Sequence, residues 1–289
     1  MVKYNPKSWF SLIFKFHKSD TFQQMKWVLL ALAVYALGIT YIELHYQEQL
    51  GFKSTTTIHS LLGFVIGLLL VFRTNTAYDR WWEGRKQWGA LVNNSRNLAI
   101  KLNATLPDDH PDRSFFKEMI PNYVYAMKEH LRGKVKPEEL ELEDENALAG
   151  MVAKDHIPNA LAQEMYKRLH AIYKADTITG DQLITLDKEM KSFTDIIGAC
   201  ERIKNTPIPY SYGLFIKKFI FVYIVTMPLG LVTDFRYWSV PIVCFVLYVF
   251  ASLELIAEEI EDPFGRDAND LPTDELSGKI KANVQEILS

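Results

Sequence analysis

Four charge-poor stretches constrain this chain of 289 residues more than any other feature of its sequence. They run from Trp27 to Ile42, Ser54 to Phe72, Phe219 to Thr233 and Tyr237 to Leu253. Each is close to the roughly 20 residues that a helix needs to cross about 30 Å of hydrocarbon, so flanking residues or packing must extend them. A polar block of about half the chain separates the two pairs. The pattern predicts an all-α membrane protein with four transmembrane helices and a large helical domain outside the bilayer.

Basic residues around these stretches predict the orientation of the chain. Five lysines precede the first stretch, a group of arginines and lysines follows the second, and Lys217 and Lys218 precede the third. Only Lys53 and Arg236 lie in the two short intervening loops. Lys and Arg near span ends stay on the cytoplasmic side. We therefore expect a multi-pass membrane protein with both termini and the polar block in the cytoplasm.

The polar block is predicted to be helical almost throughout. Apolar residues recur every three or four positions near 115–127, 160–173 and 181–204, which is the spacing of an amphipathic helix. Gly133 is expected to end the first of these helices, and Pro121 to kink or divide it. The charged run 135–147 is read as a solvated loop or a helix start, and the mixed aromatic and basic N-terminal segment as a surface-lying piece or a docked element.

The second stretch continues without a break into RTNTAYDRWWEGRKQWG, so one helix is expected to leave the bilayer and enter the polar domain. Leu62, Ile66 and Leu70 are four apart and share one face, while Gly63 and Gly67 allow close approach of a partner helix. If several copies surround an axis, the aliphatic stripe forms a narrow hydrophobic constriction. The alternative is that this stripe faces lipid or a neighbouring helix.

Charged residues near the span ends allow structural interpretations. Arg73 suits a phosphate headgroup or an acidic neighbour. Glu254, Glu258 and Glu261 invite a hard cation, although a solvated acidic helix end fits their pattern better.

Several function classes are excluded or lack support. No phosphate-binding loop, zinc-protease motif, nucleophile elbow or dinucleotide fingerprint is present, so no enzyme is expected. A net charge of −3 without a basic stripe argues against nucleic-acid binding. The seven histidines are scattered without ligand spacing. Cys200 and Cys244 fall in different parts of the expected topology, which excludes a disulfide framework.

Three motifs carry a resemblance to a known family. The segments VFRTNTAYDRWWEGRKQWG, TPIPYSYG and EDPFGRDANDLP occur in order, and together with the four stretches they resemble the bacterial branch of the bestrophin family over nearly the whole chain. The resemblance implies a homopentameric, helical ion channel with one axial pore, whose partners are its own copies, membrane lipid and monovalent ions.

The resemblance also implies roles for particular residues. Leu62, Ile66 and Leu70 would line the neck, and Ile208 would form a cytoplasmic aperture. The family's calcium clasp resembles the run containing Asp262, Asp267 and Asp270, but Arg266 stands where an acidic ligand is expected. No cofactor is therefore expected to be required, with calcium as the open alternative.

Taken together, the sequence and the resemblance predict a passive channel for monovalent ions in the bacterial inner membrane. The resemblance to the bacterial branch, whose members are associated with sodium, favours sodium over chloride. An anion channel of the same architecture and a membrane-anchored interaction protein without transport are the alternatives. The expected organisation is an interfacial N-terminal segment (1–26), a first helical pair with the pore neck (27–73), a cytoplasmic helical domain (74–212), a second helical pair (213–256) and a cytoplasmic tail (257–289).

Overall fold

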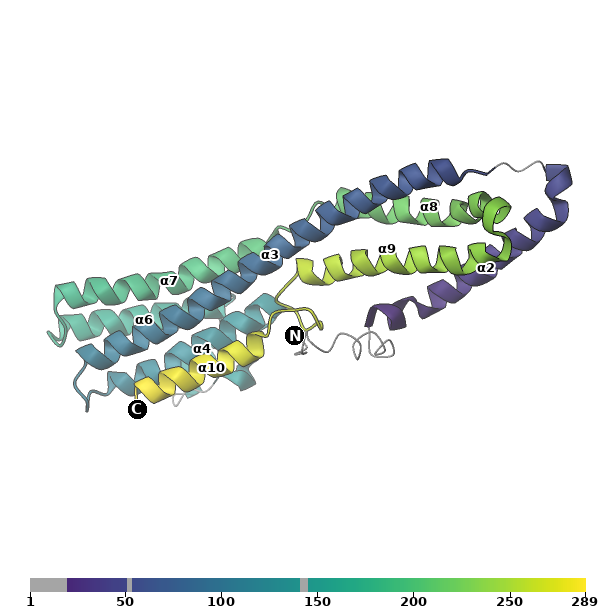
Figure 1. Cartoon of the computed structure of the whole chain (residues 1–289). Helices are drawn as coiled ribbons and strands as arrows, with labels where there is room; N and C mark the ends of the chain where they lie inside the picture. Colours follow the sequence, from purple (N-terminus) through teal and green to yellow (C-terminus); the bar gives the residue numbers. More distant parts are fainter. Residues whose placement is uncertain (1–19, 51–53, 141–144) are drawn as a thin grey trace. The chain divides into compact units, whose positions relative to one another are not determined.

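The computed structural model describes residues 20–50, 54–140 and 145–289. Every regular element within these ranges is helical, and they contain no strand, which confirms the all-α prediction (Figure 1). The N-terminal interfacial segment predicted for 1–26 lies, up to residue 19, outside the described residues. The elements are α2 (Asp20–Leu50), α3 (Thr56–Thr105), α4 (Asp112–Arg132), η2 (Pro137–Glu139), α5 (Glu145–Val152), α6 (Ile157–Lys174), α7 (Gly180–Asn205), α8 (Tyr210–Phe235), η3 (Arg236–Trp238), α9 (Ser239–Glu261) and α10 (Thr273–Ile287).

The four predicted stretches all lie in long helices. Three helical segments are long and apolar enough to cross a membrane: Thr21–Tyr46, Thr56–Thr105 and Tyr210–Glu261. The last of them contains α8 and α9, which pack against each other on either side of η3. Arg236 makes this turn with a positive φ of 48°. The helix that begins in the second stretch runs for 50 residues without interruption, as its sequence predicted.

The chain forms two compact units. Among the described residues, the span unit comprises 20–50, 54–80 and Pro207–Glu261, and the polar unit comprises 81–140, 145–206 and Asp262–Ser289. The boundaries fall within seven residues of the positions where the sequence changes from apolar to polar character.

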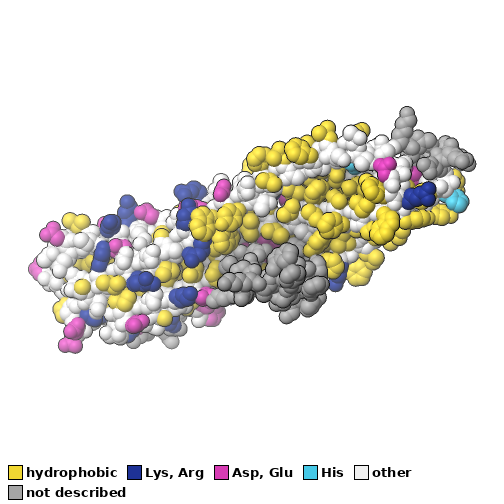
Figure 2. All heavy atoms as spheres, in the orientation of Figure 1, with side chains coloured by type: hydrophobic (Ala, Val, Ile, Leu, Met, Phe, Trp, Pro, Cys, Tyr) yellow, Lys and Arg dark blue, Asp and Glu magenta, His cyan; other side chains and the backbone are white. Residues whose placement is uncertain are grey.

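The span unit has a small internal core and an apolar outer surface. α2 packs against α8 and α9, and buried residues of α2, α3, α8 and α9 form one hydrophobic cluster. Many large apolar side chains of these helices remain exposed, and Figure 2 shows hydrophobic side chains gathered over them. An apolar surface of this extent suits hydrocarbon or a further protein subunit rather than water.

The polar unit is a helical bundle with an extensive core. Trp88 of α3, Phe116 and Tyr123 of α4 and Phe193 of α7 are completely buried in it, and the Tyr123 hydroxyl donates a hydrogen bond to the Phe193 carbonyl at 2.7 Å. The predicted amphipathic helices correspond to α4, α6 and α7. α4 ends before Gly133, whose φ is 119°, as the glycine predicted, whereas Pro121 lies inside a single continuous helix.

The expected C-terminal tail is instead an integral part of the polar unit. α10 packs against α4, and its apolar face is buried in the same core through Leu276, Ile280 and Val284. The prediction of a tail was wrong for this segment because these three residues, four apart, make one face of an amphipathic helix.

Candidate ion pathway

One face of α3 is apolar and exposed along the part of the helix that belongs to the span unit. Phe64, Leu68 and Phe72 are four residues apart and are 71%, 47% and 55% exposed, respectively. Positions four apart lie above one another on a helix, so the three side chains form one stripe. Within residues 56–73 of α3, no other set of three apolar residues spaced four apart has all of its members exposed. This stripe is available to a lumen, a neighbouring subunit or lipid.

The stripe predicted from the sequence lies on the other side of the same helix. Ile66 and Leu70 are each 1% exposed, and Leu62 packs against the same core as both of them. Residues two apart in a helix point about 160° away from each other, so Ile66 faces almost opposite to Leu68. A side chain buried inside its own subunit cannot line a channel shared between subunits. The burial of Ile66 and Leu70 argues against the predicted neck of Leu62, Ile66 and Leu70, in which Leu62 is only partly buried.

The two glycines of α3 differ in their surroundings. A Cβ atom on Gly63 would lie 2.7 Å from the Tyr223 hydroxyl of α8, whereas a Cβ on Gly67 would meet nothing within 4 Å. Gly63 therefore permits close approach of a helix, as predicted, and the helix is α8 of the same subunit. Gly67 makes no such contact within the subunit.

A buried ion-pair cluster lies directly after the apolar part of α3. The Arg73 side chain is 5% exposed, its Nη2 lies 2.6 Å from Oε2 of Glu261, and its Nε lies 3.5 Å from Oε1 of Glu254. Glu254 is also buried. The prediction of a solvated acidic helix end was wrong for Glu254, because its carboxylate is buried beside the Arg73 guanidinium. It holds for Glu258, which is about half exposed and pairs with Lys217 at 2.9 Å.

The same cluster holds the segment that contains the expected aperture residue. Ile208 lies between α7 and α8 and is partly buried, and its backbone N–H donates a hydrogen bond of 2.7 Å to Oε1 of Glu261. The Glu261 carbonyl in turn accepts a bond of 3.0 Å from Nε of Arg80. One carboxylate therefore joins α3, the end of α9 and the backbone of Ile208.

The three carboxylates of the clasp-like run do not converge. Asp262 and Asp267 are exposed, and Asp270 is buried, with its Oδ2 accepting a hydrogen bond of 2.6 Å from the Asp267 backbone N–H. Among the described residues, none of these three carboxylates belongs to a group of three or more metal-ligating side chains whose ligand atoms lie within 4.8 Å of one another.

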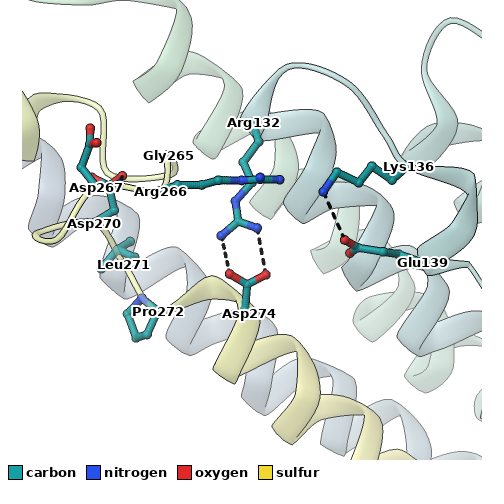
Figure 3. Close-up of a pocket in the computed structure, with 10 residues that line it drawn as sticks. All are labelled: Arg132, Lys136, Glu139, Gly265, Arg266, Asp267, Asp270, Leu271, Pro272 and Asp274. Carbon is teal, nitrogen blue, oxygen red and sulfur yellow. Dashed lines mark hydrogen bonds and ion pairs between the residues drawn. The ribbon is translucent and has the colours of Figure 1, made fainter. Parts of the chain in front are cut away.

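A pocket beside this run contains charges of both signs. It has a volume of about 390 Å³, and Figure 3 shows Arg132, Lys136 and Arg266 lining it together with acidic side chains. Arg132 holds Asp274 through two hydrogen bonds of 2.8 and 2.6 Å, which keep the pKa of Asp274 well below its ordinary value. The positive charges of Arg132, Lys136 and Arg266 would repel a divalent cation from this pocket.

Four apolar helices, α2, α3, α8 and α9, that leave an apolar outer surface are the architecture of a multi-span membrane protein. Comparison with known proteins identifies the family. The family model described as "Bacterial/Fungal Bestrophin protein" matches residues 1–286, and the chain belongs to this family.

Similar proteins carry the names of channels rather than enzymes. The chain is 31% identical to "Voltage-dependent anion channel-forming protein sll1024" of Synechocystis sp., covering 98% of this chain and 93% of that protein. It is 30% identical to "Voltage-dependent anion channel-forming protein YneE" of Escherichia coli, covering 99% and 94%. The structure superposes on that of a bacterial bestrophin homolog from Klebsiella pneumoniae with a TM-score of 0.87 and 26% identity, covering 92% of this chain and 99% of that one. These matches confirm the predicted family and class, an ion channel of the membrane.

Proposed function

We propose that copies of this chain assemble around a common axis, as a homopentamer, and conduct monovalent ions passively along it. Phe64, Leu68 and Phe72 of each α3 form the neck of this pathway. The observation that carries the proposal is that Phe64, Leu68 and Phe72 of α3 are left exposed by the other helices of the same subunit. A ring of such side chains makes a water-poor constriction, which controls ion passage by wetting and dewetting.

The second constriction of the proposed pathway lies at Ile208. Its support is the hydrogen bond from the Ile208 backbone to Glu261, which is itself held by Arg73. A side chain that narrows a pore has to be kept in place. The partly buried, charge-assisted hydrogen bond to Glu261 fixes the backbone that carries the Ile208 side chain. In this proposal Glu261 positions Ile208 and does not contact the ion.

Sodium is the ion that we propose first. In a ring of five subunits, one acidic side chain at the pathway is repeated five times, which raises the local concentration of cations. Chloride is the second candidate, because the similar proteins of Synechocystis and E. coli are named as anion channel-forming proteins. The sign of the reversal potential of one NaCl gradient across a planar bilayer decides between the two ions.

We further propose the bacterial inner membrane as the location, with both termini and the polar unit in the cytoplasm. The excess of Lys and Arg outside the two short loops supports this orientation. No cofactor is required in this proposal. Adding calcium during the current measurement tests this. An increase of the current with calcium would support calcium binding at Asp262, Asp267 and Asp270.

The assembly and the transport can each be tested on the purified protein. Mass measurement in detergent is expected to give about five times the 33.4 kDa of one subunit, and reconstituted vesicles are expected to show sodium flux. A monomer or dimer without flux would support the rival function, a membrane-anchored interaction protein. A pentamer without flux would retain the assembly and refute the conduction.

A further inference from the structure

Two histidines and one glutamate, far apart in the sequence, meet in the polar unit. His130 lies near the end of α4, His156 is the N-cap residue of α6, and Glu201 lies near the end of α7. Nε2 of His130 and Nε2 of His156 lie 2.7 and 2.8 Å from the same oxygen, Oε1 of Glu201. The two imidazole rings are 4.4 Å apart between centroids. Within the described parts of the chain, this is the one group of three or more metal-ligating side chains whose ligand atoms lie within 4.8 Å of one another.

The three side chains are partly covered but reachable from solvent. Their exposed fractions are 26%, 29% and 29%. Glu201 also lines a groove of about 540 Å³ together with Asn159, Tyr166 and Gly198. A metal ion bound here would have three protein ligands on one side and access to water on the other, which is the arrangement of an open coordination site.

The charge of the cluster suits a cation. The Glu201 carboxylate supplies the negative charge, and both imidazoles lie within hydrogen-bond distance of its Oε1. Two imidazoles and one carboxylate are ligands of the type that zinc and neighbouring transition metals prefer, whereas calcium prefers oxygen ligands alone.

We propose that His130, His156 and Glu201 form a binding site for one Zn²⁺-class divalent ion per subunit. The inference is independent of ion conduction. Neighbouring ligand atoms in a tetrahedral zinc site are about 3.3 Å apart, as follows from metal–ligand bonds of about 2.0 Å. The present separations from Oε1 of Glu201 are about half an ångström shorter. Small side-chain movements therefore separate the ligands enough to admit the ion, which replaces the two N–H···O hydrogen bonds.

His156 gives the site a structural consequence. Its Nδ1 accepts a hydrogen bond of 3.1 Å from the Asn159 backbone N–H, which caps α6. A neutral imidazole that binds a metal through Nε2 carries its proton on Nδ1, so Nδ1 can no longer accept this bond. Zinc is therefore expected to release the cap, and the Asn159 amide is expected to exchange its hydrogen faster when zinc is bound.

Three variants and one control test the proposal on the full chain in detergent, with any polyhistidine tag removed and metal stripped by a chelator. His130→Gln keeps a side-chain N–H that can donate to Glu201, and His156→Asn keeps an efficient N-cap residue. Each variant therefore removes an imidazole ligand and keeps one local hydrogen bond: the bond to Glu201 in His130→Gln and the cap of α6 in His156→Asn. Glu201→Gln removes the anionic ligand. His170→Gln is the matched control, because His170 is an exposed histidine of α6 outside the cluster.

The assay is titration with Co²⁺, followed by absorption, and with Zn²⁺, followed by calorimetry. The wild type and the His170→Gln variant are expected to bind one ion per subunit with equal affinity. The other three variants are expected to bind at least tenfold more weakly. Equal binding by the wild type and the His130→Gln and His156→Asn variants would overturn the site, as would equal loss in the control.

A measurement on the wild type alone covers the case in which a variant does not fold. Diethyl pyrocarbonate modifies accessible neutral imidazoles, and mass spectrometry locates the products. Zinc is expected to protect His130 and His156 and to leave His170 reactive. Protection of all three histidines, or of none, contradicts a specific site.

Discussion

Replacing Glu261 by glutamine is expected to destabilise the span unit and to disturb the Ile208 segment. The Glu261 carboxylate bonds Nη2 of Arg73 at 2.6 Å and the Ile208 N–H at 2.7 Å, and its side chain is 14% exposed. Glutamine can accept one of these bonds but carries no charge. Arg73 would retain only Glu254, at 3.5 Å.

The size of the effect follows from these contacts. A hydrogen bond to a charged group contributes about 1.5–3 kcal/mol, and removing one partner of a buried ion pair costs about 3–5 kcal/mol when nothing compensates. Since Glu254 compensates in part, we expect a loss of about 2–3 kcal/mol for Glu261→Gln. At roughly 2–4 °C per kcal/mol this lowers the Tm by about 4–12 °C.

Glu258→Gln is the matched control for this experiment. Glu258 lies on the same helix and forms one ion pair, with Lys217, in which both side chains are about half exposed. An exposed pair contributes less than about 1 kcal/mol, so its loss lowers the Tm by no more than about 4 °C. Thermal unfolding of both variants in detergent measures the difference. An unchanged Tm for Glu261→Gln, or an equal loss in both variants, would refute the importance of the buried cluster.

Three further predictions concern packing, pH and thiol reactivity. Gly63→Ala is expected to lower stability by about 1–3 kcal/mol because its Cβ would lie 2.7 Å from the Tyr223 hydroxyl; Tyr223→Phe should recover most of this loss in a double-mutant cycle, while Gly67→Ala should be neutral in thermal unfolding. Burial raises the pKa of Glu129, but the hydrogen bond from Arg132 and neighbouring positive charges outweigh it and hold the pKa below its ordinary value of 4.5. The stability from Glu129 is therefore complete above pH 4.5 and lost as the pH falls through the lower folded-state pKa, so Glu129→Gln should flatten the acid side of the Tm profile; an unchanged slope contradicts this. Burial raises the pKa of the Cys200 thiol to about 12, so Cys200 should resist a thiol reagent at pH 8 until the polar unit unfolds; rapid labelling of the native protein contradicts this.

Most of the architecture could be predicted from the sequence because length and periodicity are local properties. Stretches of 15 to 19 uncharged residues suffice to identify span helices, and apolar residues at intervals of three and four identified α4, α6 and α7. The same periodicity in α10 fell in a segment that was read as a tail. Its apolar stripe is short and lies among charged residues, so the sequence alone does not show that this helix covers a core.

The neck assignment shows what periodicity leaves undetermined. Both Leu62, Ile66, Leu70 and Phe64, Leu68, Phe72 are four apart, so spacing alone places each triple on one face and does not say which face another helix covers. Two neighbouring residues contained a signal. Gly63 marks close approach of α8, and Arg73, which follows Ile66 by seven residues and shares its face, requires a buried partner rather than a lumen.

The histidine cluster could not have been found from one sequence. His130 and His156 are separated by 26 positions, and Glu201 lies 45 positions beyond His156. No local ligand spacing exists over such distances, and only the packing of α4, α6 and α7 brings the three side chains together. The absence of ligand spacing along the sequence therefore holds, and the meeting of His130 and His156 at Glu201 is a feature of the packing alone.

Single cysteines on opposite faces of α3 test the conduction pathway most directly. Leu68→Cys and Ile66→Cys are compared in planar bilayers during application of a charged, water-soluble thiol reagent, with the wild type controlling for Cys200 and Cys244. The account predicts that the reagent rapidly changes the current through Leu68→Cys and leaves Ile66→Cys and the wild type unaffected. A current that responds at position 66 and not at position 68 would contradict a neck formed by the exposed stripe of α3.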